Sequence, residues 1–315
     1  MLQRSPTTMP SATPNPSPAR HAPKIAFFGT PEFAVTILNQ LEKAGFLPSL
    51  VITNLDKPKG RKLVLTPPPV KEWVTKRNIK VIQPEKLTST LLDELRAERW
   101  DMFIVAAYGK LIPKTFIELP LHGTLNVHPS LLPLFRGATP IQSAMLADAK
   151  QTGVSVMLID EEMDHGPILG QAPYDIKTIK SAAGAGGEWP KEPELEQTLG
   201  ELGGTLLAEL IPQWMDRKIQ AVAQEHHLAT YTKKITKADG LINLDDDPYL
   251  NFRKIQAFSG WPGAYFFIQK KGTSDTKQMR ITITEAAFTD GQLRILKVIP
   301  DGRKEVDYAS FLNSL

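Results

Sequence analysis

Short apolar stretches alternate with helical ones from residue 24 to residue 159, and this alternation constrains the fold more than any other feature. The apolar stretches have the length of buried strands and fall at 24–28, 49–53, 79–82, 101–107, 153–159 and the beginning of 123–140. Between them, helices are predicted at 32–44, 70–77, 88–98, 114–118 and 140–149. Strands that alternate with helices form a parallel sheet covered on both faces. We therefore predict an α/β fold with a doubly wound, mostly parallel sheet.

The turn after the first strand indicates whether this sheet binds a dinucleotide. Gly29 is followed by Thr-Pro-Glu-Phe, so the G-x-G-x-x-G fingerprint of dinucleotide-binding sheets is missing. A dinucleotide oxidoreductase is therefore disfavoured.

The composition excludes several kinds of chemistry. The chain of 315 residues contains no cysteine, which rules out disulfides, thiolate metal ligands and thiol nucleophiles. No apolar stretch reaches the length of about 18 residues that a membrane span needs, so we expect no membrane association. A formal net charge of +3 permits a polyanionic partner without requiring one.

Residues 123–140 carry the candidate chemistry. Asn126 and His128 are two positions apart on a predicted strand, so both side chains point to one face at the strand end where α/β proteins bind ligands. An amide beside an imidazole can stabilise an oxyanion and move a proton near neutral pH. We expect Asp164 to orient the imidazole, because its apolar neighbours make a partner necessary. Alternatively, Asn126 and His128 are only turn formers or satisfied core groups.

A metal site is a further alternative for this region. His122 and His165 could join His128 as ligands. The three histidines lack a recognisable ligand spacing, so we predict no metal.

Several segments resemble the signature segments of the methionyl-tRNA formyltransferases, a family of folate-dependent formyltransferases, and occur in the family's order. They are Gly29-Thr-Pro-Glu-Phe-Ala34, Ala107-Tyr-Gly-Lys-Leu-Ile-Pro113, Asn126-Val-His128-Pro-Ser-Leu-Leu-Pro133, Arg136-Gly-Ala-Thr-Pro-Ile-Gln142 and Asp164-x-Gly166. Thr230-Tyr231 and Ala257-Phe258-x-x-Trp261-Pro262 extend the resemblance into the C-terminal third.

The resemblance implies a Rossmann-like domain that transfers the formyl group of 10-formyltetrahydrofolate to the α-amine of initiator methionyl-tRNA, for use in translation initiation. It also implies that the catalytic residues are Asn126, His128 and Asp164. Tyr108 and Gly109 begin a loop whose backbone is a plausible bracket for the flat pterin ring. The turn of Ser130, Leu131, Leu132 and Pro133 resembles the family's folate-contacting segment, although it could instead only cap the strand.

A long basic loop, residues 56–69, follows the second strand. Its length and its cations, which are Lys57, Lys59, Arg61 and Lys62, suit contact with nucleic-acid backbone but also suit a solvated surface. In the family, a loop at this position inserts at the tRNA acceptor end. The resemblance therefore implies that Arg61 and Lys62 contact tRNA.

We expect four regions along the chain. They are a disordered tail at 1–23, a catalytic domain at 24–217, a linker at 218–230 and a shortened OB-like tRNA-binding barrel at 231–315. In the last region, strands are predicted at 241–244, 264–268, 279–284 and 293–298, and a helix at 248–258. We expect a cytoplasmic monomer.

Two rival functions stay open besides the oxidoreductase. The first is a folate-dependent formyltransferase that acts on a nucleotide sugar or on glycinamide ribonucleotide, against which the basic loop and the barrel argue. The second is a tRNA-binding protein that has lost catalysis. The intact set of Asn126, His128 and Asp164 argues against it.

Overall fold

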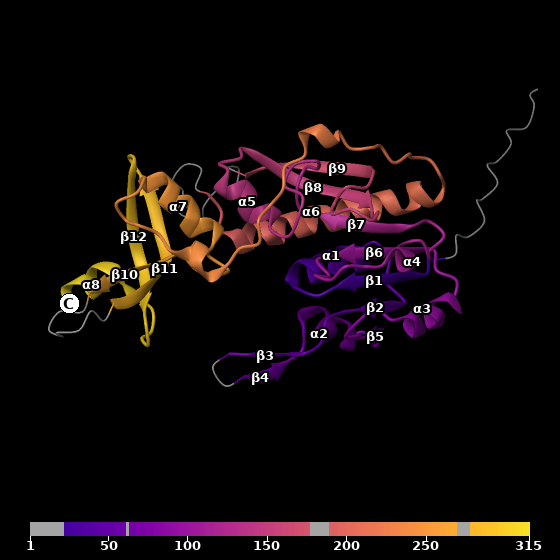
Figure 1. The fold of residues 1–315 in the computed structure, drawn as a ribbon, viewed down its shortest axis with the longest axis horizontal. Helices are drawn as coiled ribbons and strands as arrows, with labels where there is room; N and C mark the ends of the chain where they lie inside the picture. The colour runs from indigo at the N-terminus through magenta and orange to yellow at the C-terminus, as the bar shows by residue number, and fades with distance from the viewer. Residues whose placement is uncertain (1–21, 61–62, 177–188, 270–277) are drawn as a thin grey trace, which may run out of the picture.

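A seven-stranded sheet forms the centre of the larger part of the molecule (Figure 1). The computed structural model describes residues 22–60, 63–176, 189–269 and 278–315. The strand order is β5-β2-β1-β6-β7-β8-β9, and the strands from β5 to β7 run parallel to one another. The predicted doubly wound, mostly parallel α/β fold is therefore confirmed.

The elements of this part follow the predicted alternation. The strands are β1 (Ile25–Gly29), β2 (Leu50–Ile52), β5 (Lys80–Ile82), β6 (Met102–Ala106), β7 (Thr124–His128), β8 (Gln151–Leu158) and β9 (Ile168–Asp175). The helices are α1 (Glu32–Lys43), α2 (Pro69–Thr75), α3 (Ser89–Arg96), α4 (Lys114–Ile117), α5 (Pro140–Leu146) and α6 (Glu192–Met215). Prolines in the first turns of α2, α5 and α6 suit these positions, because their missing N–H groups would have no intrahelical partner.

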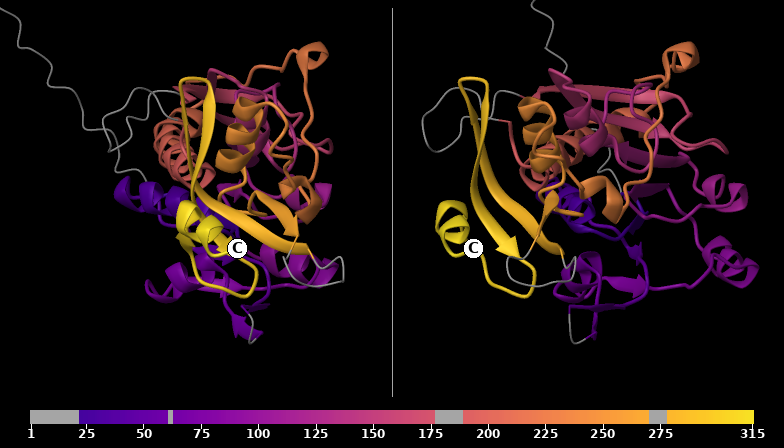
Figure 2. Two further views of the ribbon diagram at one scale, coloured as in Figure 1. Left: turned by 90° about the vertical axis from the view of Figure 1, so that its left-hand side faces the viewer. Right: turned by 60° about the vertical axis from the view of Figure 1, so that its left-hand side comes forward.

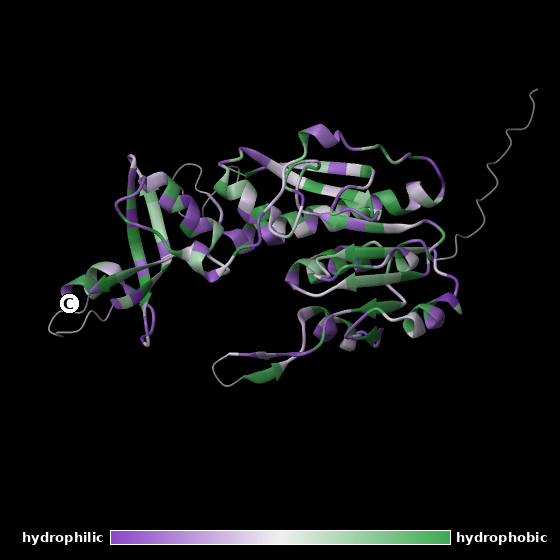
Figure 3. Ribbon diagram, in the orientation of Figure 1, coloured by the Kyte–Doolittle hydropathy of each residue, from purple (hydrophilic) through white to green (hydrophobic). Residues whose placement is uncertain are grey.

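Each face of the sheet buries its own apolar core. Because strand side chains alternate between faces, Phe27 of β1 lies in one core and Phe28 lies in the other. The first core also takes in α1, α5 and α6, and the second takes in α3. Figure 3 shows the central strands as the most hydrophobic part of the fold. The strand ends between these two cores are thus held rigidly.

Two antiparallel strands, β8 and β9, complete one edge of the sheet. The sequence did not predict β9, because Gly170 and Pro173 interrupt its apolar pattern. Its position explains why it tolerates a proline: β9 is the edge strand, and on its outer side the described residues pair with it only through the single bridge of Ile168 to Val222, away from Pro173.

The basic loop folds into a hairpin of β3 (Lys57–Lys59) and β4 (Val64–Thr66), which projects from the domain in Figure 1. Figure 3 shows β3 as hydrophilic and β4 as hydrophobic. Leu63, Val64 and Leu65 are all exposed. Arg61 and Lys62, which the sequence assigned to tRNA contact, lie outside the described residues.

A smaller antiparallel sheet follows in the C-terminal part, as the further views in Figure 2 show. Its elements are α7 (Pro248–Ala257), β10 (Tyr265–Gln269), β11 (Gln278–Thr289), β12 (Gln292–Pro300), β13 (Val306–Asp307) and α8 (Tyr308–Asn313). The predicted strand at 241–244 was wrong: Leu241 forms one isolated bridge with Tyr265, and the amide of Asn243 then accepts from the N–H of Asp245 in a turn. Residues 285–293 form the end of the β11–β12 hairpin.

The connection between the two parts returns along the outer edge of the large sheet. Figure 1 shows it leaving the far end of α6, passing β9 and reaching the C-terminal part. It contains two short 3₁₀ helices, η2 (His226–Leu228) and η3 (Lys237–Gly240). The domain boundaries at 217 and 230 remain predictions, and the tail at 1–21 and the Gly/Ala-rich stretch at 181–187 lie outside the described residues. No helix in the described ranges combines the length and the apolar character that a membrane crossing requires.

Candidate active site

A cavity of about 590 Å³ opens where the parallel strands end. The loop after β6, the end of β7, the segment that leads into α5, the β8–β9 connection and parts of α1 and α6 form its wall. This volume falls in the usual range of small-molecule sites, which runs from roughly 300 to 1,000 Å³. Asn126, His128 and Asp164 all line it.

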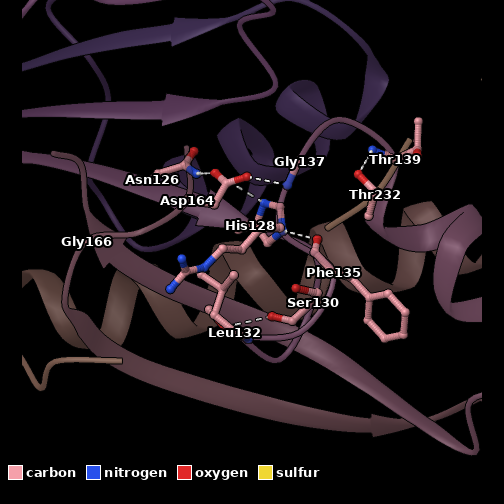
Figure 4. Close-up of polar contacts among 12 residues, drawn as sticks. Asn126, His128, Ser130, Leu132, Phe135, Gly137, Thr139, Asp164, Gly166 and Thr232 are labelled. Carbon is pink, nitrogen blue, oxygen red and sulfur yellow. Dashed lines mark hydrogen bonds and ion pairs between the residues drawn. The ribbon is translucent and has the colours of Figure 1, made fainter. Parts of the chain in front are cut away.

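These three side chains converge from two segments (Figure 4). Asn126 and His128 lie on β7, and Asp164 lies on the connection between β8 and β9. Oδ1 of Asp164 is 3.5 Å from Nδ2 of Asn126 and 3.7 Å from Nδ1 of His128. Both distances are at or beyond the outer limit of a hydrogen bond, so the amide and the imidazole nitrogen retain capacity for another partner.

His128 is buried, and one of its ring nitrogens is already bonded. Nε2 lies 3.0 Å from the carbonyl oxygen of Phe135, which can only accept. The proton of the neutral ring therefore sits on Nε2, and Nδ1, on the side of Asp164, is the nitrogen that can take up a second proton.

The loop backbone holds the carboxylate of Asp164 in place. The N–H of Gly137 donates to Oδ2 at 2.7 Å, and Asp164 itself has a φ of 50°, in the left-handed region that non-glycine residues rarely adopt. Gly137 has a φ of 114°, and a Cβ at this position would lie 2.6 Å from Oγ1 of Thr232. The approach of Gly137 to Asp164 therefore requires a glycine.

Tyr108 and Gly109, the predicted pterin bracket, lie in the cavity wall. The carbonyl of Tyr108 accepts from the side chains of Asn54, at 2.9 Å, and Thr30, at 3.3 Å, and its ring packs edge-on against Phe28. Burial raises the pKa of the Tyr108 phenol to about 12. The N–H groups of Gly109, Lys110 and Leu111 bond to no acceptor in the described residues, so they remain available to a ligand.

The second predicted folate segment is placed differently. Ser130, Leu131, Leu132 and Pro133 do not belong to the cavity wall. The hydroxyl of Ser130 donates to the carbonyl of Leu134 at 2.6 Å, and the N–H of Leu132 donates to Oγ of Ser155 at 3.0 Å. These contacts fit the alternative that this turn caps the strand, and the folate contact stays a prediction.

The three histidines considered as metal ligands have separate environments. The carbonyl of His122 accepts from the indole of Trp214 at 2.8 Å, and the ring of His165 stacks on that of His226 at 3.9 Å. In the part of the chain that the structure describes, no three acidic or histidine side chains form a group that could hold a metal ion.

Sequence analysis missed two carboxylates in the cavity wall, Glu192 and Glu196 of α6. Gln142 donates to Oε1 of Glu192 at 2.9 Å. Burial, with a contribution from the charge of Glu196, raises the pKa of Glu192 to about 7, and burial together with Glu32 raises the pKa of Glu196. No sequence signal distinguishes them, because acidic residues are common in the first turns of helices.

Comparisons with known proteins agree with this architecture. A family model described as "Formyl transferase" matches residues 23–185. The methionyl-tRNA formyltransferase of Myxococcus xanthus is 36% identical over 305 residues, which cover 92% of this chain and 94% of that protein. The methionyl-tRNA formyltransferase of Chloroflexus aurantiacus is 40% identical over 245 residues, covering 78% of this chain and 76% of that protein.

A solved structure supports the fold independently. The methionyl-tRNA formyltransferase from Clostridium thermocellum superposes with a TM-score of 0.53 at 17% identity, over 90% of this chain and 99% of that one. At this identity, the similarity concerns the fold alone.

Proposed function

The chain belongs to the methionyl-tRNA formyltransferase family, and we propose that it transfers the formyl group of 10-formyltetrahydrofolate to the α-amine of initiator methionyl-tRNA. One observation carries this proposal beyond the family relationship. An amide, an imidazole and a carboxylate, Asn126, His128 and Asp164, converge on the wall of a single cavity. This set can stabilise an oxyanion and accept a proton without an enzyme nucleophile.

Asn126 and His128 would act on the formyl oxygen. When the amine attacks the formyl carbon, the oxygen becomes an oxyanion that needs donors. Collapse of this intermediate breaks the bond between the formyl carbon and N10, and tetrahydrofolate leaves with a proton on N10. Among the described residues, Nδ2 of Asn126 has only the long contact of 3.5 Å to Asp164, so it can turn to this oxygen. Protonated Nδ1 of His128 is the second donor. A donor of this kind contributes about 10²–10³-fold to the rate.

Asp164 would manage the proton that the attacking amine releases. Its Oδ1 faces both Asn126 and His128, while Oδ2 is fixed by the N–H of Gly137 at 2.7 Å. The carboxylate can accept the amine proton directly or through water. The cavity holds amine and formyl carbon together, which supplies much of the remaining acceleration.

The folate would lie along the loop that begins at Tyr108. The free N–H groups of Gly109, Lys110 and Leu111 suit the hydrogen-bonding edge of a pterin, and the apolar side chains of Val105 and Met157 suit its faces. A flat, polar-edged ring therefore fits this wall by both shape and chemistry.

The tRNA would contact the β3–β4 hairpin and the C-terminal part. Lys57 and Lys59 are exposed on β3, beside Arg61 and Lys62 in sequence, so the hairpin presents cations to a phosphate backbone. We propose that residues 24–217 catalyse the reaction, that 218–230 link the domains, and that 231–315 hold the tRNA. A monomer in the cytoplasm would suffice for this reaction.

The test is transfer of labelled formyl from 10-formyltetrahydrofolate by the purified full-length chain. Initiator methionyl-tRNA and a nucleotide-linked amino sugar are offered as acceptors in parallel reactions. Labelled N-formylmethionyl-tRNA is the expected product. Formylation of the sugar alone would favour the nearest rival, and binding of tRNA without transfer to either acceptor would favour a protein that has lost catalysis.

A further inference from the structure

The connection between the two parts of the molecule passes directly behind Asp164. We call its residues 222–232 the strap. Val222 of the strap pairs with Ile168 through two hydrogen bonds of 2.8 Å. Farther along, Thr230 accepts from the N–H of Arg136 at 2.9 Å. The strap therefore contacts both segments that meet at the carboxylate.

Arg136 lies between the strap and the active site, with only 1% of its surface exposed. Its Nε and Nη2 donate to Oε1 of Gln224 at 3.2 and 2.7 Å, and Nη1 donates to the hydroxyl of Tyr231 at 3.3 Å. Nη2 also lies 2.9 Å from Nδ1 of His226, which must accept because a guanidinium has no acceptor. Among the described residues, this buried cation forms no ion pair with a carboxylate, so neutral groups of the strap satisfy it.

Gln224 passes this restraint on to the catalytic loop. Its amide nitrogen donates to the carbonyl oxygen of Asp164 at 2.9 Å and to that of Gly166 at 2.7 Å. A Cβ at Gly166 would lie 2.0 Å from the carbonyl oxygen of Leu158, so this loop has no room to shift toward β8. The two hydrogen bonds therefore fix the peptide groups on either side of the Asp164–Gly166 turn.

A second contact with the strap is made by the residue between Asp164 and Gly166. His165 stacks on His226 of the strap with an interplanar angle of 8°, and its Nδ1 bonds to Oδ2 of Asp160 at 2.6 Å. The loop from Asp160 to Gly166 is thus tied to the strap at two points. Asp164 needs such support, since its left-handed backbone is uncommon for a residue with a side chain.

We infer that Gln224 is a positioning residue for the reaction: oriented by Arg136, it holds the backbone of Asp164 so that the carboxylate faces Asn126 and His128. The inference rests on the proposed function for its kinetic consequence. Gln224 does not line the cavity, so it acts on the reaction only through Asp164. The connection between the domains is then part of the catalytic apparatus.

The sharpest variant is Gln224→Glu, which preserves volume and both contacts to Arg136 but replaces the amide donor with an oxygen that repels the carbonyls of Asp164 and Gly166. Gln224→Met removes the donor without adding charge, in case the first variant does not fold. Thr36→Val is the control, because it deletes a partly buried hydrogen bond of 3.0 Å to Gln197, and neither residue lines the cavity.

Steady-state formyl transfer separates positioning from a loss of stability. Misplacement of the carboxylate by about 1 Å is expected to lower kcat by up to about 10²-fold. KM for the folate and for methionyl-tRNA should stay within about twofold, as expected when ground-state binding is retained. Wild-type kcat in both Gln224 variants would overturn the inference. It would also be overturned if Thr36→Val lowered Tm and kcat as much as the Gln224 variants do, because the fall in kcat would then follow from lost stability.

A readout without substrate keeps this test separate from that of the proposed function. The amide proton of Gly137 donates to Asp164, so its NMR shift reports where the carboxylate lies. We expect the shift to move upfield in both Gln224 variants and to stay unchanged in Thr36→Val. An unmoved Gly137 signal would refute positioning even in an active enzyme. A moved signal in a protein that transfers no formyl group would refute only the proposed function.

Discussion

Nε2 of His128 lies 3.0 Å from the carbonyl oxygen of Phe135. This contact determines which nitrogen of the ring is available for proton transfer, because the carbonyl can bond only to a protonated Nε2. Phe135 is itself held by the hydroxyl oxygen of Thr230, which accepts from its N–H at 2.8 Å. The second nitrogen, Nδ1, is left 3.7 Å from Asp164, with room for a substrate atom to take part.

Replacing Asn126 tests the oxyanion role. Asn126→Ala removes the amide donor, and we expect kcat for formyl transfer to fall by about 10²–10³-fold. The side chain of Asn126 has a single long contact of 3.5 Å among the described residues, so thermal unfolding should show a nearly unchanged Tm. Turnover close to that of the wild type would remove Asn126 from the mechanism.

Replacing Asp164 tests the role of its charge. Asp164→Asn keeps an oxygen that can accept from the N–H of Gly137 but loses the negative charge beside His128, so kcat should fall by roughly 10²–10⁴-fold. Asp175→Asn, at the end of β9 and away from the cavity, is the matched control and should leave kcat unchanged. Equal rates for the two variants would show that the charge of Asp164 is not needed.

Gly137 should be intolerant of a side chain. Its φ of 114° and the distance of 2.6 Å from a built Cβ to Oγ1 of Thr232 both oppose alanine. Gly137→Ala is expected to lower the free energy of unfolding by about 1–3 kcal/mol, measured by urea denaturation. Adding Thr232→Ala relieves the steric clash but not the backbone strain, so the double variant should recover only part of the stability. Full recovery would mean that φ is not a constraint.

Glu192 should make stability depend on pH. Because its pKa is raised to about 7 in the folded state from an ordinary 4.5, the folded protein binds more protons than the unfolded chain between these values. Its contribution to stability is therefore lost as the pH rises from about 4.5 through 7. Glu192→Gln cannot ionise and should raise stability at pH 8 by roughly 1–3 kcal/mol, with little difference at pH 4.

Calorimetric scans of the wild type and of Glu192→Gln between pH 4 and pH 8 give the difference in Tm at each pH. Glu196 interacts with Glu192, and Glu32 interacts with Glu196, so the gain in stability is expected to spread over the whole pH interval. A constant difference in Tm at all pH values would contradict an effect of ionisation.

The β3–β4 hairpin should contribute to tRNA affinity through charge. Replacing Lys57 and Lys59 with Gln is expected to raise KM for methionyl-tRNA and to reduce the slope of log affinity against log salt by about 0.7–0.9 for each phosphate that is no longer neutralised. KM for the folate should not change. Lys76→Gln, an exposed lysine at the end of α2, is the control. An unaltered salt slope in the double variant would exclude contact between these lysines and phosphate.

Local patterns predicted most of the first domain. The apolar strand at 24–28 and the helix at 32–44 depend on residues close in sequence, and β1 and α1 appeared at these places. The strand β9 and the supposed strand at 241–244 were missed or wrong because they are decided by edge pairing and by a turn around Asn243. The distant pairing partners leave no periodic signal in the sequence.

In the candidate site too, features set by neighbouring residues were predicted and features set by distant contacts were not. Asn126 and His128 were expected on one face because side chains of a strand alternate, and both do line the cavity. The carboxylates of Glu192 and Glu196 were missed, since they enter the cavity from α6, more than fifty residues from β7 in the chain. The hydrogen bonds of Ser130 and Leu132 show the structural role of their turn, while the predicted folate contact of this turn stays a prediction.

The amino-acid sequence alone determined the class of fold and the strand that carries Asn126 and His128, because covalent geometry and local apolar periodicity suffice for both. Only the tertiary structure decided which nitrogen of His128 is bonded, how Gly137 reaches Asp164, and that Gln224 supports the same loop from behind. These contacts join segments that are distant in sequence and meet only when the apolar cores form during folding. Their distances depend on the packing of the whole domain, and no stretch of sequence encodes them by itself.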